Sequence, residues 1–241
     1  MTGYRFEIQN IMIGERKFSF NVFSDFEKTI DRYLDTLNPK ELDLTKHRVP
    51  LYGRIWPSAL ALGRFINENY SNDLGRKKVL ELGCGIALPG MVATALGGKT
   101  TAADYLAEIG ELLEKNKRLN GLSGIEFRLM DWQSESTPEG NYDFVIASDI
   151  LYERQYFAQI IDLLLKVSHS NTRIIIADPV RTYYGEFIEA AKKKGFSVKT
   201  EDLCTYDEAS GKDLNIRIMT LAFASSSSLS KPRPSGRGYS S

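Results

Sequence analysis

Residues 79–90 read Val79-Leu80-Glu81-Leu82-Gly83-Cys84-Gly85-Ile86-Ala87-Leu88-Pro89-Gly90. The apolar run before Gly83 is short, as expected for a central strand of a parallel sheet that is buried on both faces. Gly83 and Gly85 allow a sharp backbone turn and the close approach of a ligand. Pro89 suits the first turn of a helix. The stretch therefore predicts a strand, a Gly-x-Gly turn and a helix, the opening unit of a doubly wound α/β fold.

The turn differs from a dinucleotide-binding fingerprint at one position. The third glycine of that fingerprint would fall at position 88, where this chain has Leu88. The pattern that remains is an acidic residue two positions before a Gly-x-Gly pair, formed by Glu81, Gly83 and Gly85. It resembles the first motif of the class I methyltransferases that use S-adenosylmethionine (AdoMet). AdoMet has no pyrophosphate, and the resemblance implies that the ammonium of its amino-acid end meets Glu81 directly or through a water molecule.

Predicted strands and helices alternate along the rest of the chain. The strands are expected at residues 77–82, 99–104, 125–130, 142–147, 173–177, 196–200 and 215–223, and the helices at 57–70, 88–96, 106–120, 155–167 and 182–194. No helix separates the last two strands, which a loop at 202–214 is expected to join. This order predicts an α/β fold with a Rossmann-like, doubly wound, seven-stranded sheet that is mainly parallel and has an antiparallel last strand.

Two segments flank the main domain, which we expect to span residues 50–224. Residues 1–49 predict a β-hairpin with its turn at Gly14-Glu15, followed by a helix over 25–37 that Ser24 caps and Asn38-Pro39 ends. This extension is either a lid or platform for the main domain or packing without a direct role. Residues 225–241 are rich in Ser, Pro, Gly and Arg and predict a disordered tail.

The composition argues against several classes of protein. The 241 residues include 31 Lys and Arg and 31 Asp and Glu, so no overall charge favours nucleic acid or an anionic membrane. No apolar run is long enough to cross a membrane, and the first residues lack a signal-peptide core. Cys84 and Cys204 predict free thiols in a reducing compartment, and we expect a cytoplasmic protein. Two histidines leave little for a zinc site or a histidine-based triad, so no metal is expected.

Polar and aromatic residues follow the ends of the first four predicted strands, where ligands of open α/β sheets bind. Asp104 lies about twenty residues after Gly83, the spacing at which a carboxylate meets the ribose hydroxyls in doubly wound nucleotide sites. Asp131 and Trp132 are expected beside the adenine. Ser148, Asp149 and Tyr152 are expected where the methyl group should point. Because these residues agree with the glycine turn, they predict one AdoMet site.

Several sequence elements together resemble the seven-β-strand protein-lysine methyltransferases, a group often called methyltransferase family 16. They are Pro50-Leu51-Tyr52-Gly53-Arg54-Ile55-Trp56-Pro57-Ser58, the Glu-Leu-Gly-Cys-Gly turn, Asp131-Trp132 and Ser148-Asp149-Ile150-Leu151-Tyr152. The resemblance covers about residues 50–224 and implies methyl transfer to a protein lysine. It also implies that Asp149 and Tyr152 lie beside the acceptor and that the cofactor is lined by Trp56, Gly83, Cys84, Gly85, Asp104, Trp132 and Ser148.

The end of the fifth predicted strand, Asp178-Pro179-Val180-Arg181, is similar to the Asp-Pro-x-Arg of the branch that modifies the electron-transfer flavoprotein β-subunit. Asp178 and Arg181 are either site residues or a local ion pair. A lysine amine has an ordinary pKa of about 10.4 and must lose a proton before it accepts a methyl group. We expect Asp149 to orient that amine while water takes the proton, and Tyr152 and Trp56 to stabilise the cation through their rings.

Two other functions stay open from the sequence. A small-molecule N-methyltransferase would have the same fold and cofactor, and a non-catalytic interaction module would retain AdoMet affinity without turnover. A nucleic-acid amino methyltransferase typically carries Asn/Asp-Pro-Pro-Tyr/Phe after the fourth strand, whereas this chain has Ser148-Asp149-Ile150-Leu151-Tyr152. We therefore expect a protein acceptor, with a small-molecule acceptor as the alternative, and neither nucleic acid nor a membrane as partner.

Overall fold

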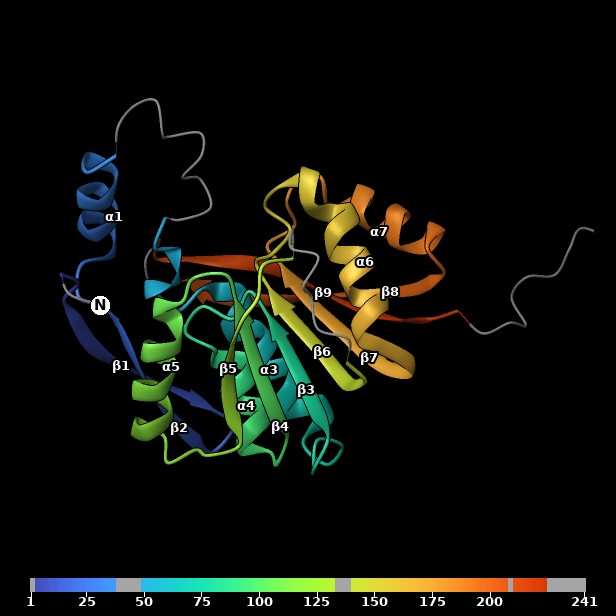
Figure 1. Cartoon of the computed structure of the whole chain (residues 1–241), viewed down its shortest axis with the longest axis horizontal. Helices are drawn as coiled ribbons and strands as arrows, with labels where there is room; N and C mark the ends of the chain where they lie inside the picture. Colours follow the sequence, from blue (N-terminus) through green and yellow to red (C-terminus); the bar gives the residue numbers. More distant parts are fainter. Residues whose placement is uncertain (1–2, 38–48, 133–139, 208–209, 225–241) are drawn as a thin grey trace, which may run out of the picture.

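The computed structural model describes residues 3–37, 49–132, 140–207 and 210–224. Its centre is a seven-stranded sheet in the order β5-β4-β3-β6-β7-β9-β8 (Figure 1). The strands are β3 Lys78–Leu82, β4 Lys99–Asp104, β5 Ile125–Leu129, β6 Tyr142–Ser148, β7 Ser168–Asp178, β8 Phe196–Asp207 and β9 Lys212–Phe223. The expected disordered tail at 225–241 and the expected helix end at Asn38-Pro39 lie outside the described residues.

The sheet is parallel except at β9. The pairs β3–β4, β3–β6, β4–β5 and β6–β7 are parallel, whereas β9 is antiparallel to both β7 and β8. The chain steps outward from β3 to β5 and then returns to β6 on the other side of β3. The carboxyl ends of β3, β4 and β6 therefore meet where the winding reverses, which is the usual ligand site of such sheets. The predicted fold class is confirmed.

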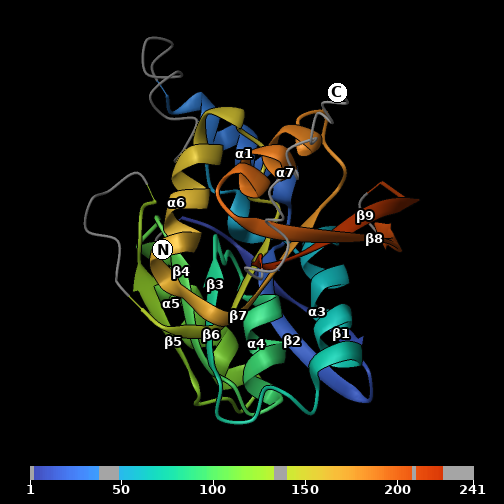
Figure 2. The ribbon, with the colours of Figure 1, turned by 90° about the vertical axis from the view of Figure 1, so that its right-hand side faces the viewer.

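Helices cover both faces of the sheet. They are α3 Pro57–Tyr70, α4 Leu88–Ala95, α5 Glu108–Leu119, α6 Phe157–Val167 and α7 Tyr184–Lys193, with short 3-10 helices η1 Leu51–Gly53 and η2 Arg154–Tyr156. Apolar residues of α3, α4 and α5 form one core, and those of α6 and α7 form a second core. Figure 2 shows α6 and α7 together, apart from α3 and α4. Side chains alternate between the two cores along β3, where Val79 belongs to the first and Leu80 to the second.

An N-terminal hairpin of β1 (Phe6–Ile13) and β2 (Arg16–Phe23) packs on the first core. Phe18 and Phe20 of β2 are buried in it. The outer edge of β2 is bound by Asn116 of α5 and by Asn120 at the end of that helix, because their side chains accept hydrogen bonds from its backbone. The predicted hairpin is confirmed, and it shares its core with the main domain.

Helix α1 (Phe26–Asp35) follows the hairpin. Asp25 caps it, since Oδ1 of Asp25 accepts a 3.0 Å hydrogen bond from the backbone N–H of Lys28. The predicted cap at Ser24 is wrong by one residue, because the hydroxyl of Ser24 instead donates to the carbonyl of Arg5. No residue of α1 is buried, so this helix adds little to the core.

The last two strands are longer than predicted, and the predicted loop at 202–214 is wrong. Strands β8 and β9 pair from Phe196–Phe223 to Asp207–Lys212. Polar residues in this stretch suggest a loop, but cross-strand pairing satisfies their backbone groups, and Asp202 forms an ion pair with Arg217 directly opposite. Arg217 also lies opposite Asp178, the last residue of β7, and β8 continues five positions past that level. The hairpin therefore projects beyond the carboxyl end of β7.

Within the described ranges, no helix combines the length and the apolar character that a membrane span requires. The same ranges hold no group of three or more His, Cys, Asp and Glu placed to bind a metal ion. The predictions of no membrane partner and of a cytoplasmic location stay predictions.

Candidate active site

A cavity of about 250 Å³ lies at the carboxyl ends of β3, β4 and β6. Residues of η1, the start of α3 and the segment after β7 complete its wall. The predicted site residues that line it are Trp56, Gly83, Cys84, Gly85, Asp104, Trp132, Ser148, Asp149 and Tyr152. Glu81 and Asp131 are not among its lining residues. The fold thus brings most of the predicted residues around one space, while their individual roles stay predictions.

The glycine turn forms the floor of this cavity. Gly83 has φ +61° and Gly85 has φ +51°, a backbone region that L side chains rarely adopt. A Cβ on Gly83 would also lie 2.9 Å from Cγ2 of Ile150, closer than side chains tolerate. Both glycines are therefore required by backbone conformation, as the sequence predicts.

Cys84, between the two glycines, holds the turn in place. Its backbone N–H donates a 3.0 Å hydrogen bond to the carbonyl of Ala103 in β4. Burial raises the pKa of its thiol well above the ordinary value, so the sulfur stays protonated. Cys84 therefore contributes a wall and a backbone anchor rather than a nucleophile.

Asp104 connects the end of β4 to the glycine turn. Its carboxylate accepts hydrogen bonds from the backbone N–H of Gly85 at 3.0 Å and of Tyr105 at 2.8 Å. Burial raises the pKa of Asp104 to about 6, although these N–H groups oppose the rise. Each carboxylate oxygen has a further lone pair, and the side chain lines the cavity, so Asp104 has capacity to accept from ribose hydroxyls.

Glu81 lies beneath the turn, on the face of the sheet that α4 covers. Its side chain is 1% exposed, and Oε2 accepts a 3.0 Å hydrogen bond from the backbone N–H of Gly90 in the first turn of α4. Burial raises the pKa of this carboxyl well above the ordinary value. In this arrangement Glu81 braces the start of α4 against β3 and does not reach the cavity wall.

Trp132 and Asp131 follow β5 but take different positions. Trp132 is partly buried and lines the cavity. Its ring lies 3.7 Å from the point that a Cβ on Gly83 would occupy, so it stands beside the glycine turn. Asp131 is exposed and lies outside the lining. Of this predicted adenine pair, the structure brings only the tryptophan to the cavity.

Asp149 is part of a buried ionic cluster. Nη2 of Arg181 donates to Oδ1 of Asp149 at 2.7 Å, and Nη1 of the same guanidinium donates to Oδ2 of Asp178 at 2.5 Å. The side chains of Asp149 and Asp178 are 17% and 0% exposed. Burial raises the pKa of Asp149, and the charge of Arg181 opposes that rise. Asp178 and Arg181 thus form both a local ion pair and a link to the predicted catalytic carboxylate, which combines the two alternatives that the sequence left open.

One oxygen of Asp149 lacks a hydrogen bond. Oδ2 is buried and meets no donor with good geometry among the described residues, and the buried hydroxyl of Ser58 is likewise without one. The hydroxyl of Ser58 is nevertheless close enough to act as a loosely aligned hydrogen-bond donor to Asp149, and this contact lowers the pKa of the carboxyl. Asp149 also has φ +57°, an uncommon conformation for a residue other than glycine. A carboxylate on a cavity wall, one oxygen of which meets no well-aligned donor among the described residues, has the capacity to accept a hydrogen bond from a ligand.

Tyrosine side chains line the cavity beside Asp149. Tyr152 is 40% exposed, and partial burial raises its pKa to about 12, so its hydroxyl stays protonated. Tyr105 lines the same space, and its pKa is raised by burial and by its proximity to Tyr152. The two rings present faces and hydroxyl groups, but no ionised phenol, to a cationic ligand.

Trp56 is held at the mouth of the cavity by neighbours on both sides. Its Nε1–H donates a 2.9 Å hydrogen bond to the carbonyl of Leu51. The guanidinium of Arg54 lies 4.6 Å from the centre of its ring, and the ring of Phe26 meets it edge-on at 6.0 Å. Arg54 also pairs with Asp207 at the tip of β8. Trp56 is therefore a partly exposed rim residue whose orientation is set by contacts from several elements.

These features fit AdoMet. The side-chain-free turn at Gly83 and Gly85 lets a ligand approach the backbone, and Asp104 offers a carboxylate to the ribose diol. Trp132 offers an aromatic surface, and the unpaired Oδ2 of Asp149 marks the side on which an acceptor amine would lie. Glu81 is held away from this space by its bond to Gly90.

Sequence reasoning missed several residues that line the cavity. Tyr105 is a partly buried wall, and Tyr52 places its backbone against the glycine turn. Arg54, whose position beside Trp56 in the Pro50–Ser58 stretch was a signal, also lines the cavity. Arg181 had a signal in the Asp178-Pro179-Val180-Arg181 motif, but its contact with Asp149 depends on the neighbouring positions of β6 and β7. Tyr105 directly follows Asp104, so its place at a strand end was a usable signal.

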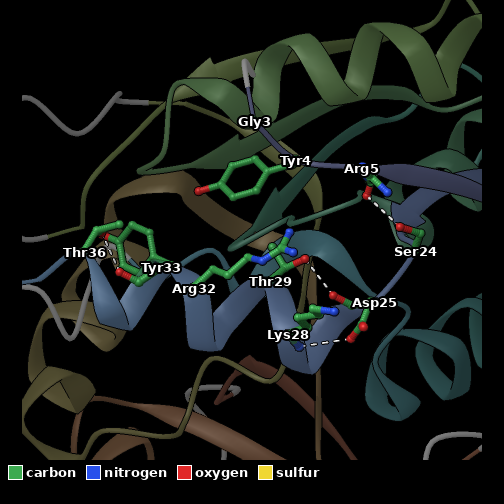
Figure 3. Close-up of a pocket in the computed structure, with 10 residues that line it drawn as sticks. All are labelled: Gly3, Tyr4, Arg5, Ser24, Asp25, Lys28, Thr29, Arg32, Tyr33 and Thr36. Carbon is green, nitrogen blue, oxygen red and sulfur yellow. Dashed lines mark hydrogen bonds between the residues drawn. The ribbon is translucent and has the colours of Figure 1, made fainter.

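A separate cavity of about 340 Å³ lies between the first residues and α1. Figure 3 shows Tyr4 above the helix, with the hydrogen bonds that Asp25 makes to Lys28 and Thr29. None of the predicted site residues lines it, and no end of a strand of the seven-stranded sheet contributes to it. Its lining includes Asp25 but neither the strand-end carboxylates Asp104 and Asp149 nor the glycine turn that indicate a catalytic site.

Comparisons with known proteins agree with this geometry. A family model described as lysine methyltransferase matches residues 37–194. Protein N-lysine methyltransferase METTL21A of Xenopus tropicalis is 29% identical over an alignment covering 53% of this chain and 60% of that relative. Histone-arginine methyltransferase METTL23 of Xenopus laevis is 30% identical, covering 64% of this chain and 69% of the relative. The aligned part thus spans less than two thirds of the first relative.

Solved structures agree at the level of the fold. A SAM-dependent methyltransferase from Agrobacterium tumefaciens superposes with a TM-score of 0.61 and 14% identity, covering 93% of this chain and 72% of that one. At that identity the likeness concerns architecture alone. The match to the family model confirms the predicted similarity to family 16, whereas the narrower branch suggested by Asp178-Pro179-Val180-Arg181 stays a prediction.

Proposed function

The chain belongs to the lysine methyltransferase family, and from this we propose that it transfers the methyl group of AdoMet to the side-chain amine of a lysine in a protein. The observation that carries the proposal is the pairing of two features in one cavity. The glycine turn and Asp104 form one side, and Asp149, with its unpaired Oδ2, forms another.

The residues for the cofactor are those that fit it in shape and charge. We assign the backbone of Gly83 and Gly85 to its amino-acid end, Asp104 to its ribose hydroxyls and Trp132 to its adenine. When bound, AdoMet supplies a methyl group on a sulfonium that is already activated for transfer, so the protein mainly positions the reactants.

Asp149 would orient the acceptor. A neutral amine donates a hydrogen bond to Oδ2 and keeps its lone pair directed into the cavity. Arg181 holds the other oxygen of Asp149, so the carboxylate has a defined orientation before the acceptor arrives. The cluster of Asp149, Asp178 and Arg181 carries two negative charges and one positive charge, and this excess of negative charge favours binding of a lysine side chain.

The proton of the lysine must leave before transfer, because its ordinary pKa is about 10.4. Asp149 is a weak base, so we assign it a hydrogen-bonding role, and we assign the proton to water at the mouth of the cavity. The ring of Tyr152 lies on the same wall and can stabilise the methylated ammonium through its face.

The test uses purified protein, AdoMet with a labelled methyl group and a cell extract that is afterwards separated into proteins and small molecules. We expect label in a protein band, with mass spectrometry locating it on a lysine. The matched variant is Asp149→Asn, because asparagine tolerates the left-handed conformation at this position. It should lower the transfer rate by about 10²-fold or more and leave AdoMet affinity nearly unchanged.

Each of the alternative results would contradict one part of the proposal. Equal losses of cofactor binding and transfer in Asp149→Asn would contradict the acceptor role of Asp149. Label in the small-molecule fraction alone would identify a metabolite methyltransferase. Label on an arginine would change the acceptor residue, as the name of the METTL23 relative illustrates.

A further inference from the structure

A groove of about 620 Å³ lies beside the active-site cavity and is not used in the proposed chemistry. We call it the β1 groove. It is bounded by the hairpin, the start of α1, α3 and the tip of β8, and the lining residues that matter here are Glu7, Ile8, Glu27, Arg54, Arg64 and Tyr206.

Residues Glu7, Ile8, Gln9 and Ile11 of β1 line one side of this groove, and the outer edge of β1 adjoins the groove at Ile8. Among the strands of the described ranges, β1 pairs with β2 alone, in a two-stranded sheet. The backbone N–H of Ser24 donates to the carbonyl of Arg5, so this pair is hydrogen-bonded, and such pairs alternate along an antiparallel ladder. In the observed register, the backbone groups of Ile8, Asn10 and Met12 therefore point away from β2.

The two edges of the hairpin differ in how they are covered. On β2, the outward N–H groups of Ser19 and Asn21 are capped by Asn120 at 2.9 Å and Asn116 at 2.8 Å. On β1, the corresponding outward groups find no hydrogen-bond partner in the described part of the chain. An uncovered strand edge of this length is a template for a further strand.

The groove has the charge and apolar surface to select what binds there. Its lining includes the carboxylates of Glu7, Asp25, Glu27 and Asp207 and the guanidiniums of Arg54 and Arg64. Arg54 is already paired with Asp207, whereas Glu7 and Glu27 form no ion pair with any described residue. Ile8 and Tyr206 are 54% and 56% exposed, so the lining also includes exposed apolar surface. The groove therefore favours basic and apolar side chains.

The β1 groove adjoins the active-site cavity at Arg54, which lines both. Its guanidinium lies over the rings of Phe26 and Trp56, at 5.2 and 4.6 Å from their centres, and is tied to Asp207. The side chain of Arg54 therefore has a fixed position between the groove and the cavity. A peptide segment that leaves the groove beside Arg54 and Trp56 enters the cavity that contains Asp149.

We propose that the β1 groove binds an extended segment of the acceptor protein, which adds to β1 as a third strand and directs the neighbouring lysine past Arg54 into the cavity. The segment has basic and apolar residues in alternation, which complement the carboxylates of Glu7 and Glu27 and the exposed side chains of Ile8 and Tyr206 in the lining. The inference rests on the proposed function for the nature of the acceptor, but binding to the groove is measurable without turnover.

The binding test uses a fluorescent peptide of about twelve residues, long enough to run along β1, in which valine and arginine alternate around one lysine. Fluorescence anisotropy measures its affinity for the full chain. The diagnostic variant is Ile8→Pro, which removes an outward N–H while leaving the bonds to β2 in place. Ile8→Ala, which keeps that N–H, is the matched control. We expect Ile8→Pro to weaken binding about tenfold more than Ile8→Ala.

A second variant does not depend on proline being accommodated. The double substitution Glu7→Gln and Glu27→Gln should weaken binding of the basic peptide several-fold and reduce its dependence on salt. A peptide with glutamate in place of arginine should bind the unaltered chain weakly. Equal affinity for the two peptides, or equal affinity of Ile8→Pro and Ile8→Ala, would refute strand addition by a basic segment.

Hydrogen exchange identifies what occupies the edge. The amides of Ile8, Asn10 and Met12 should exchange fast in the free protein and become protected when the peptide is added. Protection without peptide that grows with protein concentration would assign the edge to a second copy of the chain. Protection without peptide that disappears when residues 225–241 are removed would assign it to the chain's own tail. Either result overturns the proposal.

The two proposals fail in different ways. Peptide binding to the groove without methyl transfer to any protein would contradict the proposed function and keep the docking surface. Methyl transfer to a protein that is equally fast in Ile8→Pro and Ile8→Ala would contradict the docking surface and keep the function.

Discussion

The proposed cofactor side and the proposed acceptor side of the cavity each contain a largely buried carboxylate, but they hold it differently. Asp104 is bound by the backbone N–H groups of Gly85 and Tyr105, and burial raises its pKa to about 6. Asp149 is bound by the guanidinium of Arg181, whose full charge opposes the effect of burial. The orientation and ionisation of Asp104 therefore depend on backbone conformation and pH, whereas those of Asp149 depend on the single cation of Arg181.

The largest effect is expected when that cation is removed. Arg181→Gln leaves Asp149 and Asp178 buried without a counter-charge, and breaking such a cluster costs about 3 kcal/mol in the free energy of unfolding. Losing the charge of Arg181 also raises the pKa of Asp149 further, so the acid limb of the pH–rate profile should move to higher pH. Urea unfolding and transfer rates measured against pH check both effects.

Arg181→Lys is the matched control. It keeps the positive charge but loses the planar fork that bridges both carboxylates, so it should retain part of the stability. If Arg181→Gln changed neither stability nor the pH profile, the acceptor side would not depend on this cation.

A smaller effect is expected when the glycine turn is altered. Gly83→Ala imposes a left-handed conformation on a residue with a Cβ, at a cost of about 1–2 kcal/mol, and crowds Ile150. Thermal unfolding should show the loss, and calorimetry should show weaker AdoMet binding. Gly75→Ala is the control, because an added Cβ there meets no atom within 4 Å. Equal behaviour of the two variants would show that the turn tolerates a side chain.

The mildest effect is a pH dependence. A carboxylate accepts from both ribose hydroxyls only when ionised, so AdoMet affinity should fall about tenfold as pH decreases through about 6, the pKa of Asp104. The contribution of Asp104 to the stability of the free protein changes with pH in the opposite direction. Because burial raises the pKa of Asp104 from 3.8, its contribution is full below that value and is lost as pH rises through about 6.

Asp104→Asn separates this carboxylate from other titrating groups. Its AdoMet affinity should be lower at pH 7 and nearly independent of pH between 5 and 7, as measured by calorimetry at several pH values. An unchanged pH dependence in this variant would assign the titration to another group.

The strand-end positions in the sequence predicted most of the cavity wall, but they did not predict which way each side chain points. Glu81 has the position expected of a cofactor ligand, yet its side chain faces α4 and binds the N–H of Gly90. Val79 and Leu80 belong to opposite cores, and Glu81 lies on the same face as Val79. Alternation along the strand gives the face, but only the packed helix supplies the partner that holds the carboxylate there.

In the hairpin of β8 and β9, strand pairing likewise could not be predicted from local sequence. Residues 202–207 and 212–214 are polar enough to suggest a loop, but they pair across the two strands. Their backbone groups are satisfied by a partner strand rather than by water, and this depends on a register that local composition does not encode.

The sequence by itself determined the family, the doubly wound fold, the Gly83–Gly85 turn and the strand ends that line the cavity. These follow from apolar periodicity and from backbone conformations that few residues adopt, both of which are local. Only the tertiary structure decided that Arg181 joins Asp149 to Asp178, that Glu81 turns away and that no described strand pairs with the outer edge of β1. Each of these depends on which strand or helix lies next to which, and so on contacts between residues far apart in the chain.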